Sequence, residues 1–414
     1  MASGHKLFRY FQLLLIILAA GSIFPIIYLR HGYELTILEV FNIELYQLNL
    51  IFSVMGVVTF FGYIPSGYLS DKFSAKWLIS ISLFMTGLMG LWFARVPPLS
   101  HLIIIYVVWG FFSIFTFWGA QIKLIKLLAN ANEEGKFFGM WDGGRGVVEA
   151  LLAMLALFIF GHVMGRENVV DAPRLAITAV IYMYSISVLI VAVLIAIFVK
   201  SDKDPQTSSF KNDLIEMTHL LKNKQILLMG GIIFTGYSVF WTFRTMSRFM
   251  QSYLGVTAVT AAAIMVVAQW LRPVGGILGG YFADKLGKTK VISTTMGIGS
   301  ALLVVVALLP QSVPVPFTVV VILLTITFLW AIRGTYWSIL GDCQLPAKSM
   351  GLGIGVISLI GYLPDVFSPM LNTAAFGLFG EAFGHNGYFI LSALFGVVGM
   401  WLLHRFRKGQ GSRD

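Results

Sequence analysis

Long apolar stretches separated by short polar segments run through the whole chain. A helix needs about 20 mostly apolar residues to cross the ~30 Å hydrocarbon core of a bilayer. The sequence contains twelve such stretches, at residues 10–29, 46–69, 77–95, 99–124, 138–164, 174–199, 226–250, 257–282, 290–309, 316–340, 350–378 and 386–404. The pattern therefore predicts an all-α integral membrane protein with twelve transmembrane helices.

The composition of the 414 residues agrees with a membrane protein. Hydrophobic residues make up 57% and charged residues 12%, whereas soluble domains carry about 25% charged residues. A soluble enzyme, a nucleic-acid-binding domain and a disordered chain are therefore excluded. Cys343 is the one cysteine, the seven histidines form no i,i+4 pair, and no phosphate-binding Gly-x-x-x-x-Gly-Lys-(Ser/Thr) loop occurs. We therefore expect no metal site, no cofactor and no ATP hydrolysis.

The basic residues predict the orientation in the membrane. The net charge is +10, and with the N-terminus inside, all sixteen lysines fall on the cytoplasmic side. The outer segments then carry arginines but no lysine, and these arginines are Arg30, Arg95, Arg166, Arg174 and Arg248. Lysine and arginine in the loops favour the cytoplasmic side. We expect a multi-pass protein of a bacterial cytoplasmic (inner) membrane with both termini cytoplasmic, whose charge requires no nucleic acid.

The longest polar segment divides the chain into two sets of six predicted helices. Residues 200–224 contain Pro205 and a Thr-Ser-Ser run, which are typical of a linker. Within it, 210–221 has apolar residues at helical spacing and predicts a short amphipathic helix on the inner membrane surface. The predicted domains are an N-terminal bundle at 1–199, this cytoplasmic linker, and a C-terminal bundle at 225–414.

The two halves share a charged loop motif. The segment from Gly67 to Lys76 reads GYLSDKFSAK, and the segment from Gly280 to Lys290 reads GYFADKLGKTK. Their aspartates lie 213 positions apart (284 − 71), which indicates tandem repeats related by an axis along the membrane normal.

This motif resembles the signature Gly-x-x-x-Asp-(Arg/Lys)-x-Gly-x-x-(Arg/Lys) of the major facilitator superfamily. The second copy matches in full, whereas the first has Ser74 in place of a glycine, so its turn is expected to be looser. The resemblance implies two pseudo-symmetric six-helix bundles that alternate access to a central site. It implies a gating role for the motif residues Gly67, Asp71, Lys72, Gly280, Asp284 and Lys285. A plain topogenic basic loop is the alternative explanation.

Ionisable residues inside the predicted helices are the strongest functional signal. Burial at bilayer depth costs roughly 2.5–3.5 kcal/mol on insertion scales, so such residues face a cavity or a partner. Asp142, Arg145 and Glu149 share one helix face, and either form an ion-pair cluster that ties helices together or take part in transport. Asp365 lies between Pro364 and Pro369, where a broken helix is expected.

Guanidinium groups match the oxyanions of phosphates, sulfonates and carboxylates. The candidate substrate-binding residues are Arg30, Arg145, Arg244, Arg272, Arg333, Trp118, Gln121, Tyr237, Trp241, Gln269 and Trp337. The candidate proton-coupling residues are Asp142, Glu149 and Asp365.

Two segments are similar to the bacterial organophosphate and sugar-phosphate antiporters within the superfamily. One runs from Glu134 through Trp141, and the other is the pair Arg30 and Arg244. In that family one arginine from each half clamps a phosphate. Arg30, however, follows about twenty apolar residues, which places it near the outer surface. Arg145, Arg272 and Arg333 are therefore alternative candidates for the arginines of the clamp.

We therefore predict a secondary active transporter, not an enzyme, that moves a small anionic organic solute such as an organophosphate, sulfonate or sugar acid. It is expected to be a monomer among membrane lipids, coupled to H+ or another ion, or working by exchange. A proton-driven exporter of drugs or lipophilic cations, a lipid or lysolipid transporter, and a receptor or scaffold that does not transport are the alternatives.

Overall fold

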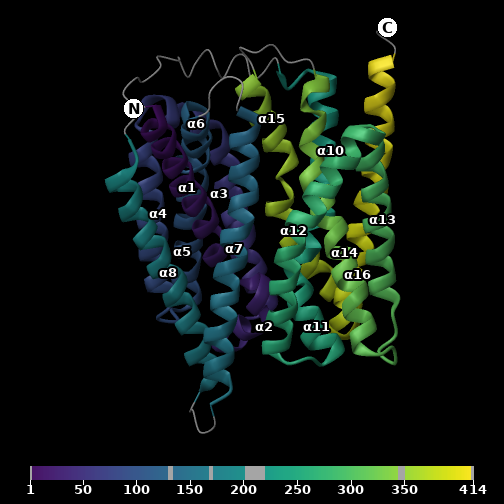
Figure 1. Ribbon diagram of the computed structural model, residues 1–414. Coiled ribbons are helices and arrows are strands. Elements are labelled where there is room, and N and C mark those ends of the chain that lie inside the picture. Colours follow the sequence, from purple (N-terminus) through teal and green to yellow (C-terminus); the bar gives the residue numbers. More distant parts are fainter. Residues whose placement is uncertain (1, 129–133, 167–170, 201–219, 344–349, 412–414) are drawn as a thin grey trace. The chain divides into compact units, whose positions relative to one another are not determined.

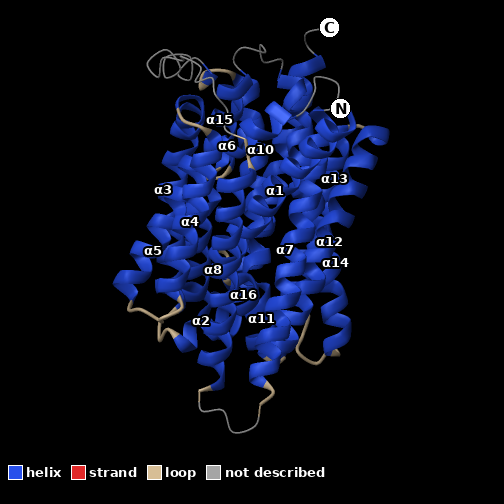
Figure 2. Cartoon of the chain, turned by 60° about the vertical axis from the view of Figure 1, so that its left-hand side comes forward, coloured by secondary structure: helices blue, strands red, loops and turns tan. Residues whose placement is uncertain are grey.

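The computed structural model describes residues 2–128, 134–166, 171–200, 220–343 and 350–411. These residues are overwhelmingly helical, and none of them belongs to a strand (Figure 2). Eleven helical segments in this part of the chain are long and apolar enough to span a membrane. The last covers Gly353–Lys408 and is interrupted at Gly380, where φ is 73°. Its 56 residues would rise roughly 84 Å as a helix, enough for two crossings, so the predicted twelve-helix fold is confirmed.

The helices form two compact units. The first comprises 1–44 and 57–209, and the second comprises 45–56 and 210–414. Helix α3, Leu45–Lys72, thus contributes its first turns to the second unit. Most of the predicted linker and of its amphipathic helix lies outside the described residues.

In the first unit, helices α1, α7 and α8 pack against one another, and α4 packs against α8 (Figure 1). Its elements are α1 Ala2–Ile27, α2 Arg30–Val40, the rest of α3, α4 Ala75–Phe93, α5 Leu99–Phe111, η1 Phe112–Thr116, α6 Trp118–Leu128, α7 Glu134–Met164 and α8 Ala172–Phe198. Buried side chains such as Ile16 and Trp109 form its core, while Phe158 is 70% exposed. An exposed apolar side chain of this size suits a lipid-facing surface.

The second unit is built in the same way. Its elements are α10 Lys224–Trp241, η2 Thr242–Thr245, α11 Met246–Leu254, α12 Ala258–Leu286, α13 Lys288–Leu308, α14 Val315–Thr335, η3 Tyr336–Cys343, α15 Met350–Gly361 and α16 Pro364–Gly411. Helix α10 packs against α15 and α16, and α12 packs against α14. This packing brings the broken segment between α15 and α16 next to α10.

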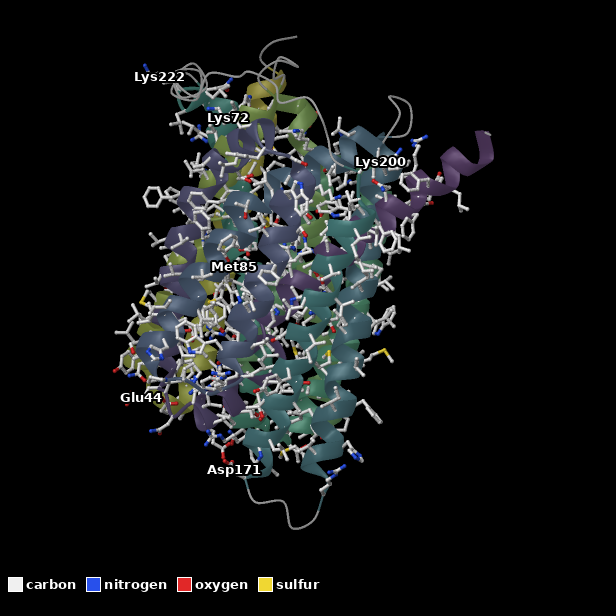
Figure 3. All side chains as sticks on the ribbon, turned by 90° about the vertical axis from the view of Figure 1, so that its left-hand side faces the viewer. Glu44, Lys72, Met85, Asp171, Lys200 and Lys222 are labelled. Atoms are coloured by element: carbon white, nitrogen blue, oxygen red, sulfur yellow. The ribbon has the colours of Figure 1, made fainter. Side chains whose placement is uncertain are left out.

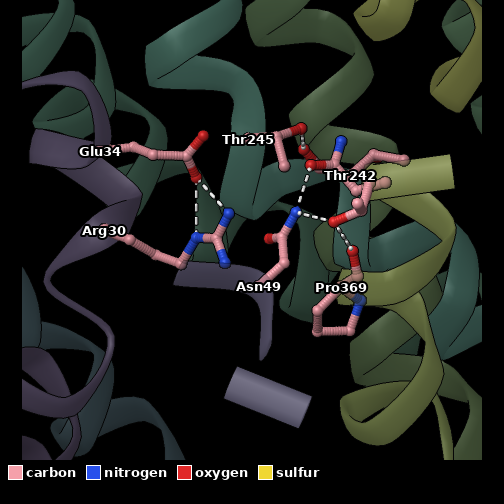
Figure 4. Close-up of polar contacts among 8 residues, drawn as sticks. Arg30, Glu34, Asn49, Thr242, Thr245 and Pro369 are labelled. Carbon is pink, nitrogen blue, oxygen red and sulfur yellow. Dashed lines mark hydrogen bonds and ion pairs between the residues drawn. The ribbon is translucent and has the colours of Figure 1, made fainter. Parts of the chain in front are cut away.

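Three of the described spans contain or run into a π-helical or 3₁₀ turn. The span of α5 and α6 contains the π-helical turn η1, and the spans of α10 and α14 run into the 3₁₀ turns η2 and η3. Thr242 Oγ1 donates to the Val239 carbonyl at 2.7 Å. Thr245 Oγ1 donates to the Thr242 carbonyl at 3.0 Å (Figure 4). Such side-chain bonds compete with the helical ladder and bend helices. The turns occur beside the aromatic and polar residues that the sequence singles out.

The two copies of the loop motif turn differently. Gly287 has φ +95°, a conformation that suits glycine. Its counterpart Ser74 has φ −60° and ψ 121°, which any residue adopts. The first copy therefore needs no glycine at this position, and its departure from the family signature leaves the turn unstrained.

Candidate functional site

Asp365 is the centre of a buried polar cluster in the second unit. Its Oδ1 accepts hydrogen bonds from the Tyr237 hydroxyl and from Trp241 Nε1, both at 2.9 Å. Arg244 Nη2 lies 3.6 Å from the same oxygen, and the two charged side chains are 4% and 12% exposed. The cluster thus joins a predicted proton-coupling residue to three predicted substrate-binding residues.

Helical spacing explains how one helix supplies three of these groups. Tyr237, Trp241 and Arg244 follow the i, i+4, i+7 pattern that places residues on one face. Side chains on a helix tilt toward its N-terminus, so the Arg244 guanidinium reaches back and donates to the Tyr237 hydroxyl at 2.8 Å. The guanidinium therefore lies deeper in the span than its backbone does.

The broken helix supplies the carboxylate. Helix α15 ends at Gly361 and α16 begins at Pro364, so the predicted interruption is present. Proline suits the first position of a helix because its missing N–H would have no partner there. Asp365 then lies in the first turn of α16, where the helix dipole favours a negative charge.

The other predicted residues of the second unit lie on aromatic rings or beside this cluster. The Arg333 guanidinium carbon is 5.4 Å from the Tyr237 ring centre and 4.9 Å from that of Phe240. Arg272 instead lies over Trp330, at 5.3 Å. Such cation–π contacts hold a guanidinium in a site of low polarity.

Two further predicted residues differ in their surroundings. Trp337 Nε1 donates to the Tyr362 hydroxyl at 3.1 Å, and the Tyr362 ring packs edge-on against Tyr237, so Trp337 reaches the cluster through one tyrosine. Gln269 is half-buried, and its Oε1 has no hydrogen-bond partner among the described residues.

A second cluster lies in the first unit. Arg145 Nε donates to Glu149 Oε1 at 2.7 Å, with side chains 10% and 11% exposed. The Arg145 guanidinium also lies over the Phe24 ring at 4.6 Å. Asp142 shares the helix but is exposed, so burial on the predicted three-charge face is confined to Arg145 and Glu149.

The aromatic and amide residues of this unit follow the π-helical turn. Trp118 packs against Trp141 with ring centres 6.4 Å apart. Gln121 is fully buried, and neither atom of its side-chain amide has a hydrogen-bond partner among the described residues. An amide left in this state is costly unless water or a ligand completes it, which makes Gln121 a candidate ligand contact.

Arg30 is buried in a helix, whereas the sequence placed it in an outer loop. The segment read as an outer loop is helix α2, and Arg30 is 0% exposed. Its Nε donates to Glu34 Oε2 at 2.7 Å (Figure 4). An i,i+4 partner of opposite charge allows the arginine to stay buried, because the pair is neutral as a whole.

The gating motifs lie in the last turns of two helices. Gly67, Asp71 and Lys72 end α3, and Gly280, Asp284 and Lys285 are in the last turns of α12. Lys72 is exposed, and Lys285 Nζ lies 4.5 Å from the Tyr281 ring centre. The side chains of Asp71 and Asp284 fall outside the described part, so the gating role of the motif residues stays a prediction.

The first turns of α3 contact α16 next to the cluster. Ser53 Oγ donates to the Val366 carbonyl at 2.6 Å, and Asn49 Nδ2 donates to Asn372 Oδ1 at 3.0 Å (Figure 4). A Cβ on Gly56 would come within 2.4 Å of the Asp365 carbonyl oxygen. The glycine is therefore required for this close approach.

Several of these residues were missed in the sequence. Glu34 could have been found, because it follows Arg30 at the i,i+4 spacing of ion pairs. The contacts of Tyr362 and Asn49 have no local signal, since their partners lie up to several hundred residues away in the chain.

Comparison with known proteins identifies the family. The profile described as Major Facilitator Superfamily matches residues 10–369. The chain is 28% identical to the inner membrane protein YqcE of Escherichia coli K12, over 87% of this chain and 85% of YqcE. It is 27% identical to the inner membrane protein YihN of the same organism, over 93% and 90%. It is 25% identical to the probable nitrate transporter NarT of Staphylococcus haemolyticus, over 87% and 88%.

Solved structures agree on the fold. A bacterial homologue of the human lysosomal transporter Spinster superposes with a TM-score of 0.73 at 13% identity, covering 97% of each chain. The nucleoside transporter NupG gives 0.72 at 13% identity, covering 97% of this chain and 99% of NupG. The chain belongs to the Major Facilitator Superfamily and is a multi-pass inner-membrane transporter, not an enzyme.

Proposed function

We propose that this transporter carries a small anionic organic solute, such as an organophosphate, a sulfonate or a sugar acid. The observation that carries the proposal is the buried Arg244, whose guanidinium is held by the Asp365 carboxylate and the Tyr237 hydroxyl. Arg333 approaches the same tyrosine from α14. Two guanidinium groups around one aromatic side chain suit an oxyanion with an organic body.

Asp365 acts as a placeholder for the substrate in this mechanism. A buried guanidinium without a counter-charge is unstable by several kcal/mol, so a carboxylate covers it when the site holds no ligand. An incoming oxyanion offers Arg244 two parallel hydrogen bonds, whereas Asp365 contacts it through one oxygen at 3.6 Å. The substrate therefore replaces Asp365 as the partner of Arg244.

Replacement of Asp365 provides a route for coupling. Once the arginine has turned to the substrate, the Asp365 carboxylate no longer has its cationic partner. Glu149, the partner of Arg145 in the first unit, repeats this arrangement. We propose that one or both acids link substrate movement to H+, with exchange of anions as the alternative drive.

The name of one relative supports an anionic substrate in general terms. NarT is named as a probable nitrate transporter, and other relatives are named as putative proline/betaine transporters. Nitrate is an oxyanion, whereas proline and betaine are zwitterions that carry a carboxylate and a cationic nitrogen. A guanidinium site that accepts a planar or carboxylate oxyanion is consistent with these names.

The orientation is also part of the proposal. Within the first unit, Lys72 and Lys200 lie at one end, and Glu44 and Asp171 lie at the other (Figure 3). Lysine favours the cytoplasmic side, so we place the end with Lys72 and Lys200 in the cytoplasm.

A lipophilic cation is the second candidate. Asp365 lies among the rings of Tyr237 and Trp241, and an acid among aromatic rings also suits a cation. The neighbouring Arg244 and Arg333 disfavour this reading, because a cation would have to displace or tolerate them.

Uptake into proteoliposomes tests the proposal. The panel contains a radiolabelled sugar phosphate, a sulfonate, a sugar acid and a lipophilic cation, each with and without an imposed proton gradient. We expect uptake of at least one anion, reduced at least tenfold by Arg244→Lys, because lysine cannot make two parallel hydrogen bonds. Arg405→Lys, at an exposed site over Trp401, is the matched control. Cation uptake alone, or anion uptake that is unchanged in the Arg244 variant, contradicts the proposal.

A further inference from the structure

A second buried arginine lies one helical turn beyond Arg244. Arg248 is 7% exposed and belongs to α11. Its Nη2 donates to Glu381 Oε2 at 3.2 Å. The other two nitrogens, Nε and Nη1, are buried without a hydrogen-bond partner among the described residues. Buried charged donors nearly always have a hydrogen-bond acceptor, so this guanidinium still has room for an acceptor from a ligand.

His385 is incomplete in the same way. It is 4% exposed, and neither ring nitrogen has a hydrogen-bond partner in the described part of the chain. Both side chains share one aromatic neighbour: the Arg248 guanidinium carbon is 4.5 Å from the Phe376 ring centre, and the His385 ring centre is 4.9 Å from it. An imidazole always carries at least one N–H donor. Two groups with unused donors thus contact the same aromatic ring.

Glu381 is well suited to give way to a ligand. Its side chain is 81% exposed, and an ion pair that includes an exposed carboxylate contributes little, because water screens it. The residue also follows Gly380, where the positive φ interrupts α16. The carboxylate can therefore leave Arg248 at low cost, in contrast to the buried Asp365.

We infer that Arg248 and His385 form a second oxyanion site that receives the substrate before it reaches Arg244. The ligand chemistry is a carboxylate or phosphate group, which both donors recognise, and the entry role rests on the proposed function. The two arginines are four residues apart, about 6 Å of helical rise, so an anion can pass from one to the other. Arg248 lies 24 residues after Lys224, roughly 36 Å along the span, and hence at the end farthest from the lysine-rich linker.

Ligand-induced thermal stabilisation tests the site with inorganic phosphate as the probe. A ligand that binds only the folded protein raises its unfolding temperature. The full-length protein in neutral detergent is titrated as wild type, Arg248→Gln, Glu381→Gln and Arg405→Gln. We expect Arg248→Gln to raise the apparent phosphate dissociation constant roughly tenfold to hundredfold, because it removes charge-assisted hydrogen bonds. Glu381→Gln removes the competing carboxylate from an exposed position and should lower the constant severalfold, while Arg405→Gln leaves it unchanged.

The Arg244→Gln background separates this inference from the proposed function. If phosphate still stabilises that variant, and Arg248→Gln abolishes the remaining effect, the second site stands whatever Arg244 binds. If Arg248→Gln and Glu381→Gln both leave the constant unchanged, the second site is refuted, even when Arg244 proves to bind anions. Stabilisation by phosphatidylglycerol vesicles without any by free phosphate would assign the site to a lipid headgroup and overturn the entry role.

Discussion

Neutralising Asp365 should destabilise the protein by leaving Arg244 buried without its counter-charge. Breaking a buried ion pair by removing one partner costs about 3–5 kcal/mol. Asp365→Asn keeps the size of the side chain and one acceptor oxygen for the Tyr237 hydroxyl or Trp241 Nε1. We therefore expect Asp365→Asn to lower the free energy of unfolding by about 3 kcal/mol, the low end of the range, and Asp365→Ala to lower it by about 3–5 kcal/mol.

Unfolding in mixed micelles measures these free energies, with Asp171→Asn as the matched control. Asp171 is exposed and makes no side-chain capping bond, so its change should stay within about 0.5 kcal/mol. In a double-mutant cycle, Arg244→Gln combined with Asp365→Asn should cost less than the sum of the two, by about 1–3 kcal/mol, because direct partners are coupled. Additive effects, or a loss below about 1 kcal/mol for Asp365→Asn, would show that the two charges do not depend on one another.

Three further changes test separate parts of the structure. Gly56→Ala should lower the free energy of unfolding by about 1–3 kcal/mol and reduce uptake, because the new methyl group overlaps the Asp365 carbonyl. Gly355→Ala, with open space at its Cβ, is the control. Equal stability of the two variants in thermal unfolding would refute the close contact. Glu34→Gln should lower the free energy of unfolding by about 3–5 kcal/mol, because it leaves the buried Arg30 without its counter-charge. Glu39→Gln, on the exposed side of the same helix, should change it by less than about 0.5 kcal/mol. Similar losses in both variants would argue against the buried pair. Gly287→Ala should cost about 1–2 kcal/mol, since φ there is +95° and a Cβ disfavours the left-handed region; an unchanged melting temperature would contradict that reasoning.

The fold was predictable because apolar periodicity is a local property of the sequence. Each stretch reveals its own span, and the repeated loop motif links the halves without any knowledge of contacts. The break before Asp365 was also predictable, since proline cannot continue a helix from the preceding turn. Burial of Arg30 was not predicted, because the count of apolar residues treats a charged residue as the end of a span and ignores its partner four residues later.

The composition of the cluster was predictable only in part. Tyr237, Trp241 and Arg244 belong to one predicted span, and their i, i+4, i+7 spacing is visible in the sequence. Their bond to Asp365 joins positions more than a hundred residues apart, and no local pattern encodes such a pairing. That Gln121 and His385 lack hydrogen-bond partners among the described residues was not predictable for the same reason, since an unsatisfied group is visible only once its neighbours are placed.

The most direct test of the account is an experimental structure of the wild-type protein bound to the anion that the uptake panel identifies. The account predicts an anion oxygen within hydrogen-bond distance of the Arg244 guanidinium, with Asp365 turned away from it. An anion bound elsewhere, with the contact between Arg244 and Asp365 intact, would contradict it.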